Sequence, residues 1–431
     1  MRLFHRPAGS RSRGLVSASH LFVTRHLLSP GSGFWRANPL SAGQSVSAAF
    51  LSLVLITGFT LVLLASAQPM PVVAQSPERL VLAFYYNWFG PNDWQPGKLV
   101  DAPQAPYTSS DRGAMGRHID QAKAAGIDAL LVNWYGPAAE NNQTETNLCA
   151  MLDEAAARGF RLAVDVDMNS PQFGNAAAMR SALATLLSRH ARHPAYLRSG
   201  GKPVVFFYHQ SARFSTDTWA AIRAAVDPDH TSLWIEEGID VSPLSVFDGH
   251  HLYSVTWPDR TDMGYTAQKF ARLVRDAAGR LGTAKIYVAT VMPGYDDRKA
   301  PGRGGTFAVG REDGAYYERS WQGAIGAAPD WIVINSFNEW YEGDTIEPSK
   351  AYGNRYLELT SAWAATFHNS TPPPVVAAAA AAATVVPTAT VQAAAPVPVP
   401  TRRPQRPVPT PTPAPPPERP VRMGPNGPWA L

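Results

Sequence analysis

Residues 76–369 alternate between two kinds of segment. Short, nearly continuous apolar runs are followed by longer segments in which apolar residues recur at helical spacing. This alternation is typical of a parallel sheet whose strands are buried on both faces. The predicted strands are 81–88, 127–135, 161–168, 203–209, 232–238, 250–257, 286–293 and 331–337, and the predicted helices are 111–125, 145–158, 175–193, 215–225, 266–281, 313–327 and 352–366.

Eight strand-and-helix units in one segment predict an α/β fold with a single (β/α)8 TIM barrel. The pattern is weakest between the fifth and sixth strands, where residues 239–249 contain no convincing helix. Because barrel enzymes build their sites at the carboxyl ends of the strands, the residues at those ends are the candidates for chemistry.

Both flanks of the predicted barrel differ from it in composition. Residues 1–44 contain six Arg and no Asp or Glu, and the uncharged, apolar segment 45–67 follows. A basic flank before such a segment predicts either a signal peptide or a retained membrane anchor, and hence an extracytoplasmic protein that is secreted or membrane-anchored. Residues 370–431 are rich in Pro, Ala and Thr, which predicts a disordered tail.

Charge follows the same division. Residues 45–369 carry 27 Lys and Arg against 33 Asp and Glu, so the basic character of the whole chain resides in its flanks. A nucleic-acid partner therefore has no electrostatic basis in the barrel. Cys149 is the only cysteine, which excludes an intrachain disulfide and a zinc site built on several thiolates; we expect it to be buried and inert. We expect a monomeric barrel without metal or cofactor.

The stretch 338–347, NEWYEGDTIE, directly follows the last predicted strand. If its turn is helical, Glu339 and Glu342 face the same way and act on one substrate, because positions i and i+3 are neighbours on a helix. Trp340 and Tyr341 then offer flat apolar faces to a sugar ring. A solvated turn that merely contains acids is the alternative.

Polar and aromatic residues also gather at the other predicted strand ends. A cleft lined by Trp, Tyr and carboxylates suits carbohydrate, because sugars offer apolar C–H faces for stacking and hydroxyl groups for hydrogen bonds. Glycosidic cleavage needs two carboxylates with different protonation states. The predicted catalytic pair is Glu339 and Glu342, and the predicted substrate-binding residues are Tyr85, Tyr86, Trp88, Asn133, Trp134, Asp167, His209, Glu236, Tyr253, Tyr295, Asn338 and Trp340.

Several candidates keep two interpretations. Glu236 and Glu237 either contact sugar hydroxyls or supply a carboxylate to a double-displacement pair. Asp165 and Asp167 share one side of their strand, which faces either the barrel interior or the helices. Histidines 209, 250 and 251 are too scattered to indicate a metal, and the glycine-rich segment 302–305 is interpreted as a crossing over the site after the seventh strand.

The stretch 338–348 resembles glycoside hydrolase family 99, the family of endo-α-1,2-mannosidases and endomannanases. Segments 84–90, 125–136, 247–249, 292–297 and 314–318 support the resemblance, which spans about residues 80–365. It implies a TIM barrel, no metal, and endo-acting, anomer-retaining hydrolysis in which the substrate's 2-hydroxyl attacks the anomeric carbon. Glu339 then resembles the base acting on that hydroxyl and Glu342 the general acid/base, with Tyr253 nearby and Tyr86, Asn133 and Trp134 lining the sugar subsites.

The chain departs from the family pattern at three places. Residues 92–96 replace a His-Trp element, Tyr341 replaces a histidine between the glutamates, and Asp344 and Thr345 alter the segment after Gly343. Both carboxylates remain, so the sequence predicts a retaining endo-glycoside hydrolase acting on an extracellular α-linked glycan, with mannose as one candidate sugar. The alternative is a surface barrel that binds carbohydrate without cleaving it.

Overall fold

The computed structural model describes residues 78–256 and 262–371. The predicted basic flank 1–44, the apolar segment 45–67 and all but the first two residues of the tail 370–431 lie outside these ranges. In the part of the chain that the structure describes, no helix is both long enough and apolar enough to cross a membrane.

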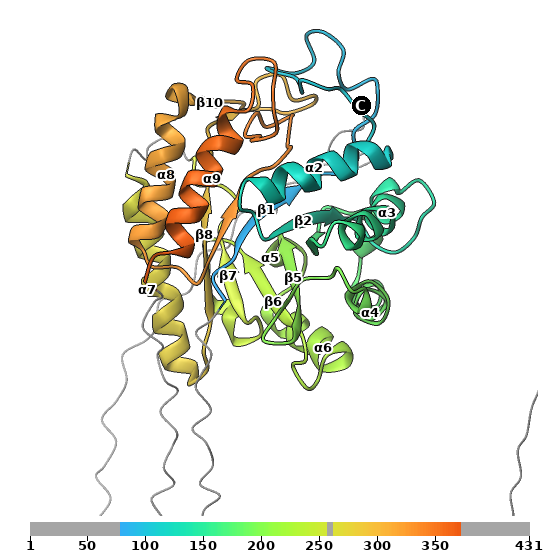
Figure 1. Ribbon diagram of the computed structural model, residues 1–431. Helices are drawn as coiled ribbons and strands as arrows, with labels where there is room; N and C mark the ends of the chain where they lie inside the picture. Colours follow the sequence, from blue (N-terminus) through green and yellow to red (C-terminus); the bar gives the residue numbers. More distant parts are fainter. Residues whose placement is uncertain (1–77, 257–261, 372–431) are drawn as a thin grey trace, which may run out of the picture. The chain divides into compact units, whose positions relative to one another are not determined.

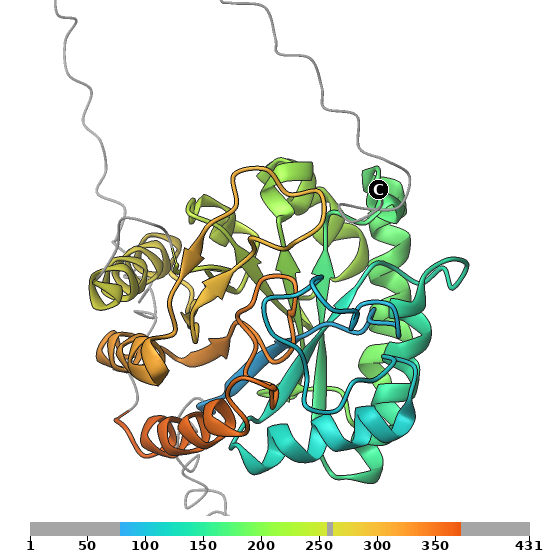
Figure 2. The same cartoon turned by 90° about the horizontal axis from the view of Figure 1, so that it is seen from above.

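Eight parallel strands form a closed barrel with helices around it (Figures 1 and 2), which confirms the predicted TIM-barrel fold. Pairing of β3 with β5 joins the first and last of these parallel strands and closes the barrel. The barrel strands are β1 (Val81–Tyr85), β2 (Ala129–Trp134), β3 (Arg161–Asp167), β5 (Lys202–Tyr208), β6 (Leu233–Glu237), β7 (Gly249–His251), β8 (Ile286–Val291) and β11 (Trp331–Ile334).

The helices are α2 (Arg112–Ala124), α3 (Gln143–Ala157), α4 (Ala176–Ser188), α5 (Gln210–Arg213), α6 (Thr216–Val226), α7 (Met263–Leu281), α8 (Ala315–Gly326) and α9 (Arg355–His368). Side-chain caps fix several of their starts: Asp111 accepts from the Gly113 amide, and Asn175 from the Ala178 amide. Between β6 and β7 there is only a 3-10 turn, Ser242–Ser245, as the weak pattern indicated. The predicted strand 250–257 is too long. Strand β7 ends at His251, residues 252–256 are described but are not in a strand, and residue 257 is outside the described ranges.

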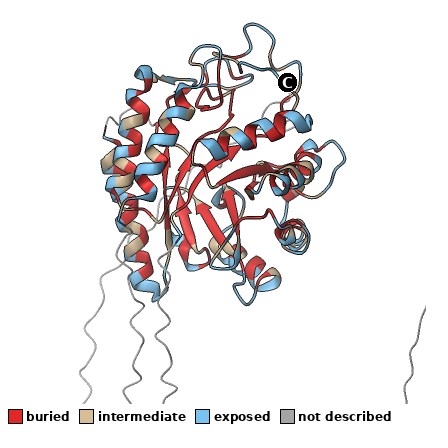
Figure 3. Cartoon of the chain, in the orientation of Figure 1, coloured by how far each residue is buried: buried red, intermediate tan, exposed pale blue. Residues whose placement is uncertain are grey.

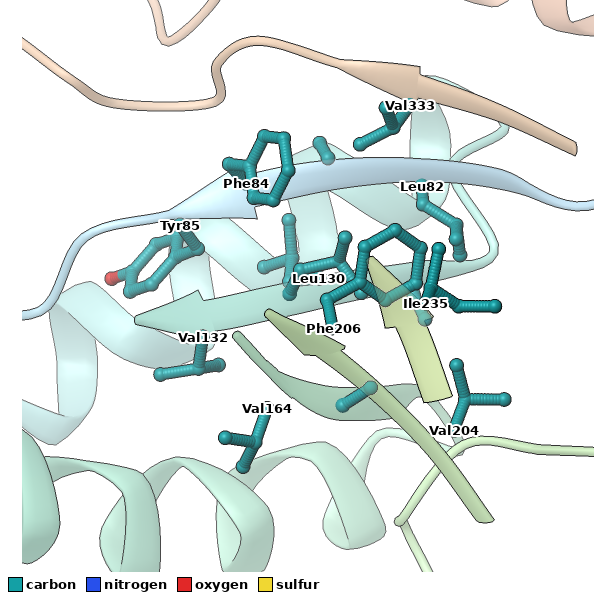
Figure 4. Packing of buried hydrophobic residues seen from close by; sticks show 14 of the residues in the cluster. Leu82, Phe84, Tyr85, Leu130, Val132, Val164, Val204, Phe206, Ile235 and Val333 are labelled. Carbon is teal, nitrogen blue, oxygen red and sulfur yellow. The ribbon is translucent and has the colours of Figure 1, made fainter. Parts of the chain in front are cut away.

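Alternation along each strand divides its side chains between the barrel interior and the helix layer. In the interior, Phe84 of β1 packs edge-to-face on Phe206 of β5 (Figure 4), with ring centroids 6.3 Å apart. His251 of β7 contacts both rings. The strands are buried on both faces, whereas the helices expose their outer surfaces (Figure 3). This double burial explains why the strands read as continuous apolar runs.

Two small additions extend the barrel. Strand β4 (Arg198–Ser199) pairs antiparallel with β5, and β9 (Tyr295–Asp296) pairs antiparallel with β10 (Ala308–Val309). The β9–β10 hairpin follows β8 and lies beside the turn that carries Glu339 and Glu342, since the Asp296 amide donates to the Glu342 carbonyl oxygen across 2.7 Å.

Candidate active site

Glu339 and Glu342 lie on a tight turn that follows β11. The Glu342 amide donates to the Glu339 carbonyl oxygen across 3.3 Å, a one-turn hydrogen bond that is not continued into a helix. Both residues are buried, at 3% and 6% exposure, and both line one cavity of about 420 Å³. A short turn therefore brings both carboxylates to a single space at the carboxyl end of the barrel.

The cavity is lined by seven of the residues singled out from the sequence, together with six others. The seven are Tyr86, Trp88, Asn133, Asp167, Tyr253, Glu339 and Glu342; the six are Tyr135, Asn169, Tyr208, Gly302, Arg303 and Gly304. They come from the ends of β1, β2, β3, β5 and β11 and from the segments after β7 and β8. The structure thus assembles aromatic faces, two side-chain amides and three carboxylates around one space.

Three predicted substrate-binding residues face the helix layer instead. The Tyr85 hydroxyl lies 3.0 Å from His118 Nδ1 of α2, and Trp134 Nε1 donates to Glu145 of α3 across 2.8 Å. Glu236 Oε2 accepts from Gln210 of α5 across 3.1 Å. Each occupies the strand position next to an inward-facing neighbour, so strand alternation turns it away from the cavity.

Asn338 and Trp340 flank Glu339 on the turn but lie outside the cavity lining. Asn338 Oδ1 accepts from the Tyr86 amide across 2.7 Å, and its Nδ2 donates to the Tyr86 carbonyl oxygen across 2.8 Å. Trp340 is 1% exposed, and its Nε1 donates to Glu347 across 3.0 Å. These two side chains tie the turn to β1 and to the protein interior, and Trp340 does not present a flat face to the cavity.

Tyr295 and His209 lie near the site on different surfaces. Tyr295 lines a second cavity of about 230 Å³ behind the β9–β10 hairpin, and its hydroxyl donates to Asp297 across 3.1 Å. His209 is exposed and stacks on Tyr208, with ring centroids 4.5 Å apart. Neither side chain lines the cavity that holds the two glutamates.

Two residues hold the Glu342 carboxylate. The Tyr253 hydroxyl donates to Oε2 across 3.0 Å, and Arg303 donates to Oε1 and also contacts Asp297 across 3.0 Å. The Tyr86 hydroxyl lies 2.7 Å from that of Tyr253. Glu342 therefore sits between a cation and a chain of two phenols, and both of its oxygens are hydrogen-bonded.

Glu339 has a different electrostatic environment. Its Oε1 accepts from the Tyr341 amide across 3.0 Å. Burial, followed by the negative charges of Glu342 and Asp344, raises the pKa of Glu339 well above the ordinary range for a glutamic acid. The two glutamates thus differ in their partners, as paired carboxylates with separate tasks do.

Asp165 and Asp167 both face the barrel interior, because Asp165 pairs with the inward Phe206 and Asp167 with Tyr208. Asp167 Oδ2 accepts from Asn133 Nδ2 across 3.1 Å at the cavity. Burial raises the pKa of both carboxyl groups, and for Asp165 the Asp167 charge adds to the effect.

Sequence reasoning did not select Tyr208 or Arg303. Tyr208 ends β5, and an even step along the strand from the inward Phe206 would have indicated that it faces the cavity. Arg303 belongs to the segment interpreted as a crossing over the site, and residues 302–304 do line the cavity. Its contact with Glu342 depends on the path of a long loop, which no periodic pattern encodes.

One group of possible metal ligands occurs among the described residues. Ligand atoms of Glu145, Cys149 and His190 lie within 4.8 Å of one another. Glu145 already accepts from Trp134 and is 3.2 Å from Arg189 Nη1, which places a cation beside the group. We interpret it as a hydrogen-bonded structural network. Cys149 is partly exposed, so the expectation that it is buried is wrong.

A TIM barrel whose cavity combines paired carboxylates with aromatic side chains has the architecture of a glycoside hydrolase. Residues 102–367 match the model of Glycosyl hydrolase family 99. The chain belongs to this family and is a glycoside hydrolase, which confirms the resemblance found in the sequence.

Curated relatives and a solved structure agree with this assignment. The human glycoprotein endo-alpha-1,2-mannosidase-like protein is 26% identical over 69% of this chain and 78% of its own length. The Xenopus laevis glycoprotein endo-alpha-1,2-mannosidase is 25% identical over 61% and 64%. The GH99 endo-alpha-mannosidase structure from Bacteroides thetaiotaomicron, in complex with BIS-TRIS-propane, superposes with a TM-score of 0.58 at 25% identity, covering 67% of this chain and 97% of that one.

Proposed function

We propose that this protein is a retaining endo-glycoside hydrolase that cleaves an α-linked, mannose-containing glycan. The observation that carries the proposal is the shared cavity of Glu339 and Glu342. The substrate class comes from the relatives, which are named endo-alpha-1,2-mannosidases. A cavity of about 420 Å³ falls in the size range of small-ligand sites and offers both aromatic faces and hydrogen-bonding groups.

In the proposed mechanism Glu339 removes a proton from the 2-hydroxyl of the sugar at the cleavage point. The oxygen of that hydroxyl attacks the anomeric carbon and forms a 1,2-anhydro sugar, while Glu342 donates a proton to the leaving oxygen. Glu342 then takes a proton from a water molecule, whose oxygen attacks the anomeric carbon. The bond from that carbon to O2 breaks, Glu339 returns its proton to O2, and the configuration is retained. These roles follow the family resemblance, and the position of both carboxylates on one cavity is consistent with them.

Arg303 has a specific bearing on the first step. Its guanidinium donates to Oε1 of Glu342, the carboxyl group that acts as acid in the proposed mechanism. Since Arg303 sits on the long segment between β9 and β10, we propose that substrate entry displaces its guanidinium from Glu342.

We further propose that the protein acts outside the cytoplasm, on the basis of the basic flank and apolar segment of residues 1–67. Separation of cell fractions, with the protein detected by antibody, tests this location. Recovery of the protein solely in the cytoplasmic fraction would contradict it.

The function is tested with the full chain against a panel of α-linked polysaccharides that includes α-mannan. We expect oligosaccharide products, and nuclear magnetic resonance of fresh product should show the α-anomer first. Glu342→Gln and Glu339→Gln should each lower turnover by about a thousandfold or more while substrate binding stays measurable. Glu358→Gln on the exposed face of α9 is the matched control. Binding without any cleavage by the unaltered protein would favour the alternative, a carbohydrate-binding barrel.

A further inference from the structure

A third carboxyl group lies beneath the two glutamates and lines neither cavity described above. Asp344 is 0% exposed. Its Oδ1 accepts from the Ser336 hydroxyl across 2.7 Å, whereas Oδ2 has no hydrogen-bond partner in the described part of the chain. A buried carboxyl group with one bare oxygen costs stability, so its presence beside a reaction centre calls for a functional account.

The contact between Asp344 and Ser336 extends to Glu339. The Glu339 amide donates to Ser336 Oγ across 2.7 Å. A serine hydroxyl has one proton, and because Asp344 accepts it, a lone pair of Oγ is directed at the Glu339 amide. The backbone of Asp344 is itself fixed, since Arg311 Nη2 donates to the carbonyl oxygens of Gly343 and Thr345, across 2.9 and 2.8 Å. Asp344 thereby sets the position of Glu339 on the turn.

The charged and titratable groups around Asp344 come from four segments. They are Glu339 and Glu342 on the same turn, Arg303 and Arg311 from the segment after β8, Tyr295 of β9, and Tyr253 from the segment after β7. Burial and then the Glu342 charge raise the pKa of Asp344 well above its ordinary range, and the Ser336 hydrogen bond, Arg311 and Arg303 oppose this shift.

We propose that Asp344 is a positioning residue that holds Glu339 in place through Ser336. A catalytic base is effective only when its carboxylate is held in the reacting geometry, and this chain of hydrogen bonds fixes the backbone from which Glu339 projects. This inference rests on the proposed roles of Glu339 and Glu342. It assigns a use to a position at which the chain departs from the family pattern.

The first test compares kcat and KM. Asp344→Ala removes the acceptor of the Ser336 hydroxyl, so we expect kcat to fall about tenfold with KM changed less. Asp344→Asn retains an oxygen for Ser336 and should restore most of that loss. Asp229→Asn, an exposed position after α6, should leave both constants unchanged. An unchanged kcat in Asp344→Ala would overturn the positioning role.

Ser336→Ala tests the same contact from the side of the serine. This variant removes the hydroxyl between Asp344 and Glu339 and retains the Asp344 carboxyl group. We expect kcat to fall about tenfold or more across the pH range, with KM changed less, because the base is displaced while the binding surface remains. An unchanged kcat would overturn the positioning role.

A measurement without substrate keeps this inference separate from the proposed function. Because folding raises the pKa of Asp344, the unaltered protein loses stability as pH rises from about 4 towards the folded value. Asp344→Asn should therefore have the higher Tm at pH 7 to 8, and the difference should vanish below about pH 4. Equal Tm values at every pH would mean that folding does not raise the pKa of Asp344, and would overturn its placement in the buried contact with Ser336 on which the positioning role depends. Absence of glycan cleavage by the unaltered protein would instead contradict the proposed function and leave this reading of Tm intact.

Discussion

Tyr253 donates its hydroxyl proton to Oε2 of Glu342 across 3.0 Å, although the two residues lie 89 positions apart in the chain. Burial, and next the Glu342 charge, raises the pKa of Tyr253 well above its ordinary range, so the phenol stays protonated and remains a donor. The bond joins the segment after β7 to the turn after β11 and thus crosses the mouth of the barrel.

Tyr253→Phe removes this donor and leaves the ring in place. A hydrogen bond to a charged group contributes about 1.5–3 kcal/mol, so we expect kcat/KM to fall roughly tenfold to a hundredfold. Steady-state kinetics on the substrate found in the polysaccharide panel measures the loss. Tyr265→Phe on the exposed face of α7 is the control, and an equal loss in both variants would contradict a specific role for Tyr253.

Glu339→Gln should make the protein more stable at neutral pH. Burial and the neighbouring carboxylates raise the pKa of Glu339 in the folded state, so the unaltered protein loses stability as pH rises above 4.5, the ordinary value. The variant does not ionise and avoids this loss. Thermal unfolding from pH 3.5 to 8 should give the variant the higher Tm above about pH 5 and equal values at the acid end. A variant that is less stable at pH 7 would contradict the electrostatic argument.

Glu347 ties the turn after β11 to buried side chains of the protein interior. Its Oε2 accepts from Tyr107 and from Trp340, each across 3.0 Å, and its Oε1 lies 3.2 Å from His118 Nε2. Glu347→Ala leaves these buried groups without their carboxylate and should lower the free energy of unfolding by about 3–5 kcal/mol. Urea unfolding measures the change, and Glu358→Ala on α9 is the exposed control. A loss below about 1 kcal/mol would show that the anchor contributes little.

Asn133 and Trp134 test the alternation of β2. Asn133 lines the cavity and donates to Asp167, whereas Trp134 donates to Glu145 in the helix layer. Asn133→Ala should raise KM about three- to tenfold, because a single hydrogen bond contributes about 1 kcal/mol. Trp134→Phe should lower Tm and leave KM within a factor of two. The opposite result, in which Trp134→Phe changes KM and Asn133→Ala does not, would mean that the strand faces are reversed.

The barrel itself could be predicted because its pattern is local. Each strand is a continuous apolar run, and the absence of an α-helix between β6 and β7 was indicated by a segment without helical periodicity. Strand ends were also located well enough to identify Tyr86, Asn133 and Asp167, which line the cavity. These features depend on spacing within one element, which the sequence contains directly.

Side-chain direction was the weaker part of the prediction. Tyr85, Trp134 and Glu236 were chosen together with their neighbours at strand ends, yet strand alternation sends them to the helix layer. When both faces of a strand are buried, hydrophobicity does not reveal which face looks inward. The contact between Arg303 and Glu342 could not be predicted for another reason, because Arg303 lies on a loop that has no periodic pattern.

Arg79 connects the first and last segments of the described barrel. Its Nη2 donates to Ser370 Oγ across 2.6 Å, and its Nε donates to the Phe367 carbonyl oxygen across 3.2 Å. The first and last described segments therefore lie side by side at the end of the barrel opposite the cavity. Adjacent ends of this kind favour circular permutation and insertion into a host protein. A barrel limited to residues 78–371 and attached through either terminus would keep its cavity turned away from the support.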